Sequence, residues 1–331
     1  MRILYSFGQW CSGSQIQFER FAKQSSDDIR VAGYIGSSKN LLHINWTLDA
    51  CNKDIKWHPI RAKKFFKHNG SPKIDLAVAG QLRSDIEKFD PELIICDFEP
   101  IVAHIAYTLG IKTWYCSPVH LFDGIDWQQG DLKYSYQLNP FRKILNNLPP
   151  ADKIFVASPF GDIESSPVLK SGYSWLKPYH TPGKGLLRNK NILVVDKGRS
   201  SKIPRIFNSL DEPFVLFETD QIDNPVINYA QNLANGKYYH CNGESGFLAD
   251  AIYNHIPKIS LSPSLKDPEG LLNGIISQYY YFIHNLSQLE LMDYYAVEEV
   301  EKVMKGAPCF SYLKKEWHHT LDEEIKNAFS S

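Results

Sequence analysis

Short apolar runs recur along the chain, and the stretches between them have apolar residues at helical spacing. Short runs bounded by glycine, proline or polar residues are typical of buried strands. We therefore predict strands over residues 2–7, 29–35, 93–96, 111–116, 151–158, 191–196, 213–218 and 259–261. Helical spacing predicts helices over residues 14–24 and 74–89 and from Pro100 onward. Because strands and helices alternate, we expect an α/β protein with Rossmann-like parallel sheets.

This alternation is interrupted at residues 179–190 (YHTPGKGLLRNK), which are rich in proline, glycine and basic residues. We predict that this segment is a linker. A chain of 331 residues is long enough for two α/β domains of ordinary size. We predict an N-terminal domain over residues 1–182, a C-terminal domain over 183–310 and a terminal helix over 311–331. Within that last segment Trp317, Leu321 and Ile325 repeat at helical spacing.

Composition narrows the class of protein. The formal net charge is −1 and 43% of the residues are hydrophobic, so the chain as a whole does not resemble a polyanion-binding protein. The six cysteines are scattered without a CxxC pair, which predicts neither a zinc site nor a disulfide framework. No apolar run approaches the ~18 residues of a membrane span, and the first run is too short for a signal peptide. We expect a cytoplasmic protein without a metal site.

Residues 240–274 (HCNGESGFLADAIYNHIPKISLSPSLKDPEGLLNG) carry the most informative pattern. We predict a small-residue turn, a helix, a short strand, an acidic turn and a second helix. The N-terminus of a helix presents free backbone N–H groups, which favour phosphate binding. A carboxylate near the start of the first helix, Asp250, could accept hydrogen bonds from ribose hydroxyls. Glu269 opens the second helix. The candidate ligand-binding residues are His240, Gly243, Ser245, Gly246, Asp250, Glu269 and Asn273.

This stretch resembles the donor-binding signature of GT-B nucleotide-sugar glycosyltransferases. The matching positions are His240-Cys241, Gly243, Asp250-Ala251, Pro257, Pro263, Glu269 and Asn273-Gly274. Asp250 stands where the family has Glu, Gly270 where it has Gln, and His255 where it has Gly. The resemblance implies two Rossmann-like domains facing a cleft, with a C-terminal helix crossing back to the first domain.

The same resemblance implies a reaction. An acceptor hydroxyl attacks the anomeric carbon of a nucleotide-sugar, a UDP-sugar in many relatives, and the relatives that match best invert that carbon. Asp250 would then bind the ribose and Glu269 the sugar. The loop after strand 191–196 would contact the diphosphate, which makes Lys197, Gly198, Arg199 and Ser200 candidates. Cations there can neutralise the charge of the departing diphosphate, so no metal or other cofactor is required.

An inverting transfer also needs a group that takes the acceptor proton. The loop after the first strand lacks G-x-G-x-x-G, and Gln15 stands about where relatives carry a histidine base. Asp97 ends a buried strand, where open α/β sheets bind their ligands. An alternative is that Asp97 caps the helix that follows. The candidate catalytic residues are Asp97, Glu99, His120 and Asp123.

Residues 61–73 combine five basic residues with Phe65 and Phe66, a pattern that can bind nucleic acid, although a solvated loop also explains it. Several readings therefore remain open. The protein is a transferase acting on a glycan, a lipid-linked or a small-molecule acceptor, or it is a DNA glucosyltransferase that holds DNA through 61–73. It is otherwise a UDP-sugar epimerase of the same fold, or a non-catalytic sugar-nucleotide binder.

Overall fold

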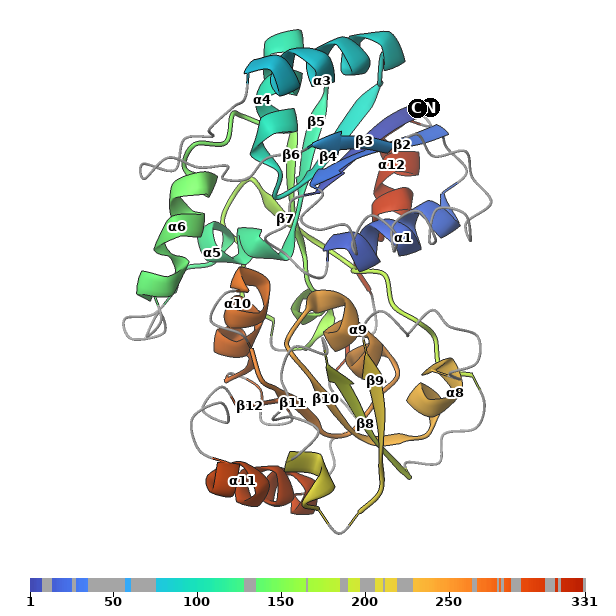
Figure 1. Ribbon diagram of the computed structural model, residues 1–331, viewed down its shortest axis with the longest axis vertical. Coiled ribbons are helices and arrows are strands. Elements are labelled where there is room, and N and C mark those ends of the chain that lie inside the picture. Colours follow the sequence, from blue (N-terminus) through green and yellow to red (C-terminus); the bar gives the residue numbers. More distant parts are fainter. Residues whose placement is uncertain are drawn as a thin grey trace. The chain divides into compact units, whose positions relative to one another are not determined.

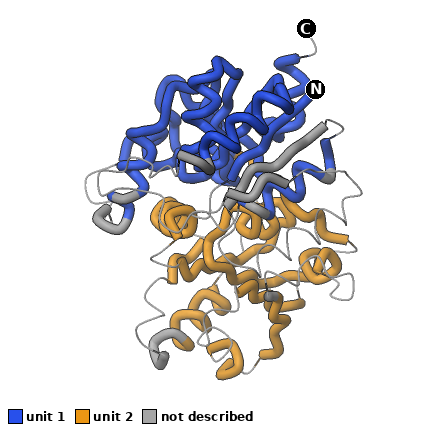
Figure 2. The backbone as a smooth tube through the Cα atoms, turned by 45° about the horizontal axis from the view of Figure 1, so that its top comes forward, with its two compact units in different colours: residues 1–161, 167–178, 318–331 blue, residues 162–166, 179–317 orange. Residues whose placement is uncertain are grey.

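The computed structural model describes residues 1–7, 14–25, 28–34, 57–60, 76–127, 135–164, 166–184, 190–196, 206–210, 212–218, 229–263, 267–278, 280, 283–286, 293–306, 313–314 and 317–329. The chain divides into two compact units (Figure 2). Unit 1 contains residues 1–161, 167–178 and 318–331, and unit 2 contains residues 162–166 and 179–317. Each unit contains one parallel β-sheet flanked by helices (Figure 1).

The sheet of unit 1 has seven parallel strands in the order β3-β2-β1-β4-β5-β6-β7. The strands are β1 (Arg2–Phe7), β2 (Asp28–Tyr34), β3 (Trp57–Ile60), β4 (Leu93–Asp97), β5 (Thr113–Cys116), β6 (Lys153–Ala157) and β7 (Tyr173–Leu176). The chain runs outward from β1 in one direction through β2 and β3, and in the other through β4 to β7. The sheet therefore has its topological switch point between β1 and β4.

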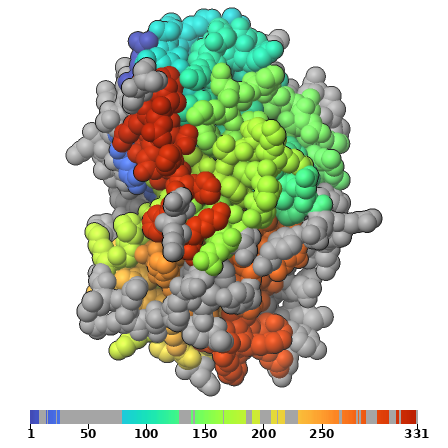
Figure 3. Space-filling view, turned by 180° about the vertical axis from the view of Figure 1, so that it is seen from behind, coloured from blue at the N-terminus to red at the C-terminus, as the bar shows by residue number. Residues whose placement is uncertain are grey.

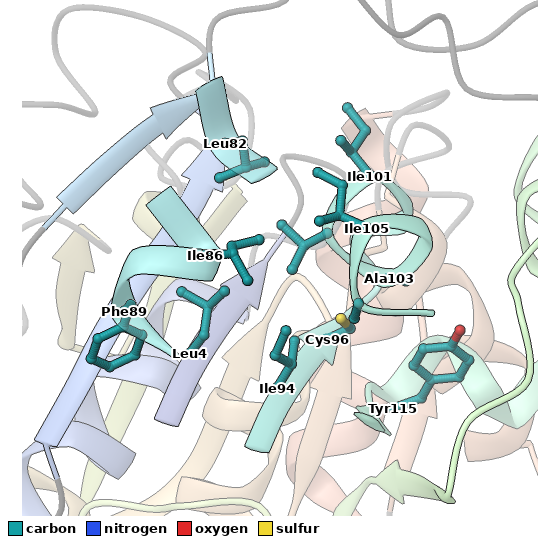
Figure 4. Close-up of a cluster of buried hydrophobic side chains, with 12 residues drawn as sticks. Leu4, Leu82, Ile86, Phe89, Ile94, Cys96, Ile101, Ala103, Ile105 and Tyr115 are labelled. Carbon is teal, nitrogen blue, oxygen red and sulfur yellow. The ribbon is translucent and has the colours of Figure 1, made fainter. Parts of the chain in front are cut away.

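Helices cover the sheet of unit 1 and bury its apolar side chains. They are α1 (Ser14–Gln24), α3 (Leu76–Phe89), α4 (Pro100–Leu109), α5 (Leu121–Gly124), α6 (Ser135–Leu145) and α12 (Leu321–Phe329). Figure 4 shows Ile86 of α3 beside Leu4 of β1, in the same apolar cluster as Ile94 of β4 and Ile105 of α4. These side chains belong to one continuous apolar cluster, whose removal from water is the main contribution to the stability of this layer.

Helix α4 begins and ends where its sequence dictates. Glu99 is the N-cap, and its carboxylate accepts hydrogen bonds from the backbone N–H groups of Ile101 (3.0 Å) and Val102 (2.6 Å). Pro100 occupies the first turn, where a missing N–H costs nothing. Gly110 ends the helix in the left-handed conformation, with φ 67°. The cap is Glu99 and not Asp97, so the alternative role considered for Asp97 is wrong.

The last helix, α12, belongs to unit 1. Lys153 of β6 pairs with Glu324 of α12 at 3.3 Å, and the ring of Phe329 lies 6.1 Å from that of Trp114. Figure 3 shows the red C-terminal residues beside the yellow-green residues of β6 and β7. The predicted helical repeat is wrong at its first position, because Trp317 precedes α12 and is 47% exposed.

Unit 2 contains a sheet of five parallel strands in the order β12-β11-β10-β8-β9. Its elements are β8 (Asn191–Asp196), β9 (Phe214–Glu218), α8 (Tyr229–Ala234), β10 (Gly236–Cys241), α9 (Ser245–Tyr253), β11 (Ile259–Leu261), α10 (Pro268–Ser277), β12 (Ile283–Asn285) and α11 (Asp293–Lys305). The switch point of this sheet lies between β8 and β10. In the part of the chain that the structure describes, no helix has the length and apolar character needed to cross a membrane.

We predict that Glu99→Ala destabilises unit 1. The substitution leaves two buried N–H groups of α4 without their acceptor, which costs about 1–3 kcal/mol. The apparent free energy of unfolding in urea measures this loss. Glu87→Ala is the control, because Glu87 is half-exposed and its ion pair is with Arg83, one turn away on the same helix, so we expect a change within about 0.5 kcal/mol. Equal losses in the two variants would contradict the capping role.

Candidate functional site

The carboxyl edge at the switch point of unit 1 is formed by the ends of β1 and β4. Phe7 and Asp97 are register partners as the last residues of these strands. Open α/β sheets bind ligands at this edge because the connections diverge there and leave space. Asp97 is therefore the candidate carboxylate that the topology places best.

Asp97 is buried, with 2% of its surface exposed. The Tyr5 hydroxyl donates a hydrogen bond to Oδ2 at 3.4 Å, and Oδ1 has no hydrogen-bond partner within the described residues. Burial raises the pKa of Asp97 to about 7, although the nearby hydroxyls of Ser14, Ser117 and Tyr5 oppose the rise. A carboxyl group that has a pKa near neutrality and an oxygen without a hydrogen-bond donor can accept a proton from a bound hydroxyl.

The turn after Asp97 is strained. Phe98 has φ 52°, a left-handed conformation that is uncommon for an aromatic residue, and its side chain is buried. The capping bonds of Glu99 fix the turn on one side, and the ring of Phe141, 6.2 Å away, packs on the other. Such strain persists only where the surrounding structure imposes it, and it is frequent at functional sites. The turn at Phe98 therefore fixes the orientation of Asp97 at the end of β4.

The other three catalytic candidates occupy different environments. Glu99 is fully buried and also accepts a hydrogen bond from the Ser6 hydroxyl at 3.2 Å, which indicates a structural role. His120 is buried and its ring stacks on Tyr115, with centroids 5.7 Å apart. Burial lowers the pKa of His120 to about 4, so the ring is neutral. No described hydrogen bond joins Asp97 to His120 or Asp123.

Asp123 lies on α5 and is half-buried. Burial raises its pKa, and the positive charges of Arg142 and Lys170 oppose this rise. Two positive charges thus favour the ionised form of Asp123 and make it a poorer proton acceptor, whereas no cation opposes the rise at Asp97. Of the four candidates, Asp97 is therefore the one whose position and chemistry best suit a base.

In unit 2 the switch point lies at the ends of β8 and β10. His240 is the second-last residue of β10, and the turn into α9 follows it. The predicted phosphate loop, Lys197 to Ser200, lies outside the described residues, directly after the last residue of β8. The described half of this edge is thus the turn between β10 and α9.

That turn is braced by α10. Glu269 Oε1 accepts a hydrogen bond from the N–H of Ser245 at 2.6 Å. The side-chain amide of Asn273 donates to the Gly243 carbonyl (2.7 Å) and to Ser245 Oγ (3.0 Å). Gly243 has φ 93°, and a Cβ there would lie 3.1 Å from the backbone of Gly270, so both the conformation and the close approach require glycine.

The N-terminus of α10 lies beside this turn. Asp267 caps α10 by accepting hydrogen bonds from the N–H groups of Glu269 (3.1 Å) and Gly270 (3.4 Å). The structure thus brings together the predicted residues Gly243, Ser245, Glu269 and Asn273, and it places Gly246 in the first turn of α9. Asn273 Oδ1 is buried and has no partner among the described residues.

Asp250 occupies a different position from the predicted one. It lies in the middle of α9 and is fully buried, whereas we expected it near the start of the helix. Its Oδ1 accepts a hydrogen bond from the N–H of Thr181 (2.6 Å), and its Oδ2 accepts one from the Tyr229 hydroxyl (2.9 Å). Asn254 likewise accepts a hydrogen bond from the N–H of Gly183. Through these hydrogen bonds, the segment that we predicted to be a linker is attached to helix α9.

Three further polar residues near these edges are not among the candidates that the sequence predicts. Ser14, the first residue of α1, is buried and its hydroxyl has no partner within the described residues. Tyr5 faces Asp97 from within β1. Ser260 of β11 contacts His240 at 2.7 Å. No sequence signal marks Tyr5 or Ser260, because each lies inside a run that only predicts a buried strand. The described residues also contain no group of three His, Cys, Asp or Glu side chains that could hold a metal ion.

Comparison with known proteins supports the architecture. No protein-family model matches the chain, and no curated protein matches its sequence. Among solved structures it is similar to MurG of Acinetobacter baumannii, with 9% identity, a TM-score of 0.58 and 99% of each chain covered. It is also similar to a Polygonum tinctorium UDP-glucosyltransferase that glucosylates indoxyl, with 12% identity, a TM-score of 0.59 and 92% and 90% covered.

A third likeness is to Phytolacca americana UGT2 complexed with UDP-2-fluoro-glucose and pterostilbene, with 12% identity, a TM-score of 0.55 and 92% and 91% covered. Similarity at this level of identity demonstrates the fold. The predicted GT-B fold, with two Rossmann-like units, is therefore confirmed.

We predict that Asp97→Asn stabilises the protein at neutral pH. Between the ordinary pKa of 3.8 and the folded value of about 7, the folded protein keeps a proton that the unfolded chain has lost. The contribution of Asp97 to the free energy of unfolding therefore falls as the pH rises through this window, by up to roughly 4 kcal/mol. Asparagine does not titrate and avoids this loss.

Urea unfolding at pH 4 and pH 8 measures the difference. The gain from Asp97→Asn should be small at pH 4 and larger at pH 8. Asp126→Asn is the control, since the side chain of Asp126 is 89% exposed. A gain that does not change with pH would contradict the burial of an ionised Asp97.

Proposed function

We propose that this protein is a glycosyltransferase that moves a sugar from a nucleotide-sugar, a UDP-sugar, to an acceptor hydroxyl with inversion at the anomeric carbon. One observation carries the proposal. At the switch point of unit 1, the edge at which this class of sheet binds ligands, a buried aspartate has an oxygen without a described partner and a pKa raised to about 7. The GT-B fold supports the class of reaction.

The proposed reaction assigns each unit a task. The acceptor oxygen attacks the anomeric carbon, the bond from that carbon to the diphosphate oxygen breaks, and the acceptor proton passes to Asp97 Oδ1. A base with a pKa close to the working pH combines an ionised form with useful basicity. Positioning of the hydroxyl beside Oδ1 contributes further, because it converts a bimolecular step into a unimolecular one.

The donor is assigned to unit 2. The turn between β10 and α9 is held rigid by Glu269 and Asn273, and it opens a helix whose N-terminus favours phosphate. The Phytolacca protein is complexed with a UDP-sugar analogue, which supports UDP as the nucleotide. Because Asp250 is engaged within the protein, we assign it to the framework of the site and not to the ribose.

The acceptor is a glycan, a lipid-linked molecule or a small molecule. The alternative of a DNA acceptor depends on residues 61–73, which lie outside the described residues. A non-catalytic binder has no need of a base, so the raised pKa of Asp97 favours a catalytic role over that alternative. An epimerase also has to remove a proton, from a carbon of the sugar, and the release of UDP on addition of an acceptor distinguishes a transferase from it.

We expect Asp97→Asn to lower turnover by a factor of about 10² or more and to leave the affinity for the donor nearly unchanged, since the variant keeps the size of the side chain but loses the base. Turnover of the parent should rise with pH through about 7, because Asp97 must be ionised to accept the proton. UDP release from a panel of UDP-sugars, with water or added acceptors, measures both effects. Asp126→Asn should behave like the parent. Parental turnover in Asp97→Asn would remove the role from this residue.

We expect Glu269→Ala to weaken donor binding, because the variant releases the N–H of Ser245 and loosens the turn before α9. A nucleotide-sugar at 100 times its dissociation constant adds about 2.7 kcal/mol to the stability of the parent, and a panel screened by thermal unfolding identifies the preferred donor. The variant should show a clearly smaller shift with that donor. Glu212→Ala, which removes a surface ion pair with Lys237, is the control. Equal shifts in parent and Glu269→Ala would contradict the assignment.

A further inference from the structure

Ser14 is a buried polar residue at the carboxyl edge of unit 1 to which the proposed reaction gives no role. It is the first residue of α1, and 1% of its surface is exposed. Its hydroxyl has no hydrogen-bond partner within the described residues. Buried polar groups are nearly always paired, so an orphan at this edge calls for an explanation.

The packing of α1 on β1 places Ser14 beside Asp97. Phe7 ends β1 and is the register partner of Asp97, so the chain enters α1 from the edge at which β4 ends. The ring of Phe18 of α1 lies 5.1 Å from that of Tyr5, whose hydroxyl donates to Asp97. The Ser14 hydroxyl is close enough to the Asp97 carboxylate to oppose the rise in its pKa.

The other two hydroxyls near Asp97 already form hydrogen bonds. Tyr5 donates to Oδ2, and Ser117 Oγ accepts from the N–H of Val119 at 3.4 Å. Asp97 Oδ1 and Ser14 Oγ are both buried and have no partner within the described residues. An ionised carboxylate only accepts, whereas a serine hydroxyl can donate. A group that satisfies both atoms must donate one hydrogen to Oδ1 and accept one from Ser14.

We infer that Ser14 Oγ and Asp97 Oδ1 hold the attacking oxygen of the acceptor between them, and that Ser14 makes the site selective for a hydroxyl over an amine. The inference rests on the proposed function, because it concerns the same acceptor and the same base. An alcohol oxygen carries one hydrogen and two lone pairs. One lone pair accepts the Ser14 hydrogen, and the other forms the bond to the anomeric carbon. The acceptor hydrogen passes to Asp97 Oδ1, and the diphosphate leaves with the electrons of the broken bond.

An amine meets the same two atoms differently. Its nitrogen has one lone pair, which must form the new bond, so an attacking amine cannot accept a hydrogen bond from Ser14. The serine can turn to accept an N–H instead, but its own hydrogen then returns to the Asp97 carboxylate and competes there with the acceptor. The Ser14 hydroxyl therefore stabilises the attack of an alcohol and not that of an amine.

The test compares 3,4-dichlorophenol with 3,4-dichloroaniline, two acceptors that differ only in the attacking atom. UDP release is measured with the donor that thermal unfolding identifies. We expect Ser14→Ala to lower kcat/KM for the phenol by about tenfold, the contribution of one hydrogen bond, and that for the aniline by less than about twofold. KM for the donor should stay at the parental value, which shows that the variant is folded.

Two further variants complete the comparison. Ser14→Thr keeps the hydroxyl and should restore most of kcat/KM for the phenol. Ser25→Ala is the matched control, because Ser25 is also a buried serine and directly follows the last residue of α1. It should behave like the parent with both acceptors.

Equal losses with phenol and aniline in Ser14→Ala would overturn the inference, since they would show that Ser14 acts on Asp97 alone. An unchanged value for the phenol would also overturn it. The proposed function survives either result as long as Asp97→Asn loses turnover. If the parent uses neither ring, hydrolysis of the donor by water replaces the phenol, and an unchanged rate in Ser14→Ala would overturn the inference. A parent that releases UDP in none of these reactions would overturn the proposed function as well.

Discussion

The need to pair buried polar groups is the constraint on which the arrangement of this protein depends. At several helix starts and in α9 the need is met within the protein. Glu99 accepts from the first turn of α4, Asp250 from Thr181 and Tyr229, and Asp267 from the first turn of α10. At the edges it is not met within the described residues. Asp97 Oδ1 in unit 1 and His240 Nε2 in unit 2 are each buried without a partner.

Much of the fold could be predicted from the sequence because most strands are short, continuous apolar runs. The expected strands at residues 2–7, 191–196 and 259–261 are found as β1, β8 and β11. Strands that mix polar with apolar residues gave no such signal. β10 (GKYYHC) was not predicted as a strand, and only its last residues were noticed, as the start of a turn. β3 and β7 are likewise too short and too polar for periodicity to identify.

The candidate site was predicted less completely, for a physical reason. A sequence motif shows only the order of the residues. The role of a side chain also depends on which of its atoms already form hydrogen bonds within the protein. Glu269 is expected to contact the sugar, and the structure shows its carboxylate accepting a hydrogen bond from the first residue of α9. Asp250 was expected near the start of α9 and is engaged in its middle. Asp97 and Glu99 are two residues apart, yet only the backbone geometry around Phe98 shows which one is the cap.

The distribution of the chain between the two units has a consequence for synthesis. Unit 1 includes residues 318–331, which leave the ribosome after all of unit 2. Within unit 1, His319 accepts a hydrogen bond from the N–H of Lys177, and Glu324 pairs with Lys153. Domains usually fold in the order in which they are made. Here the N-terminal sheet emerges first, but its unit is completed only by the last helix. Until residues 318–331 have been made, Trp114 of β5 and Lys153 of β6 lack their partners in α12.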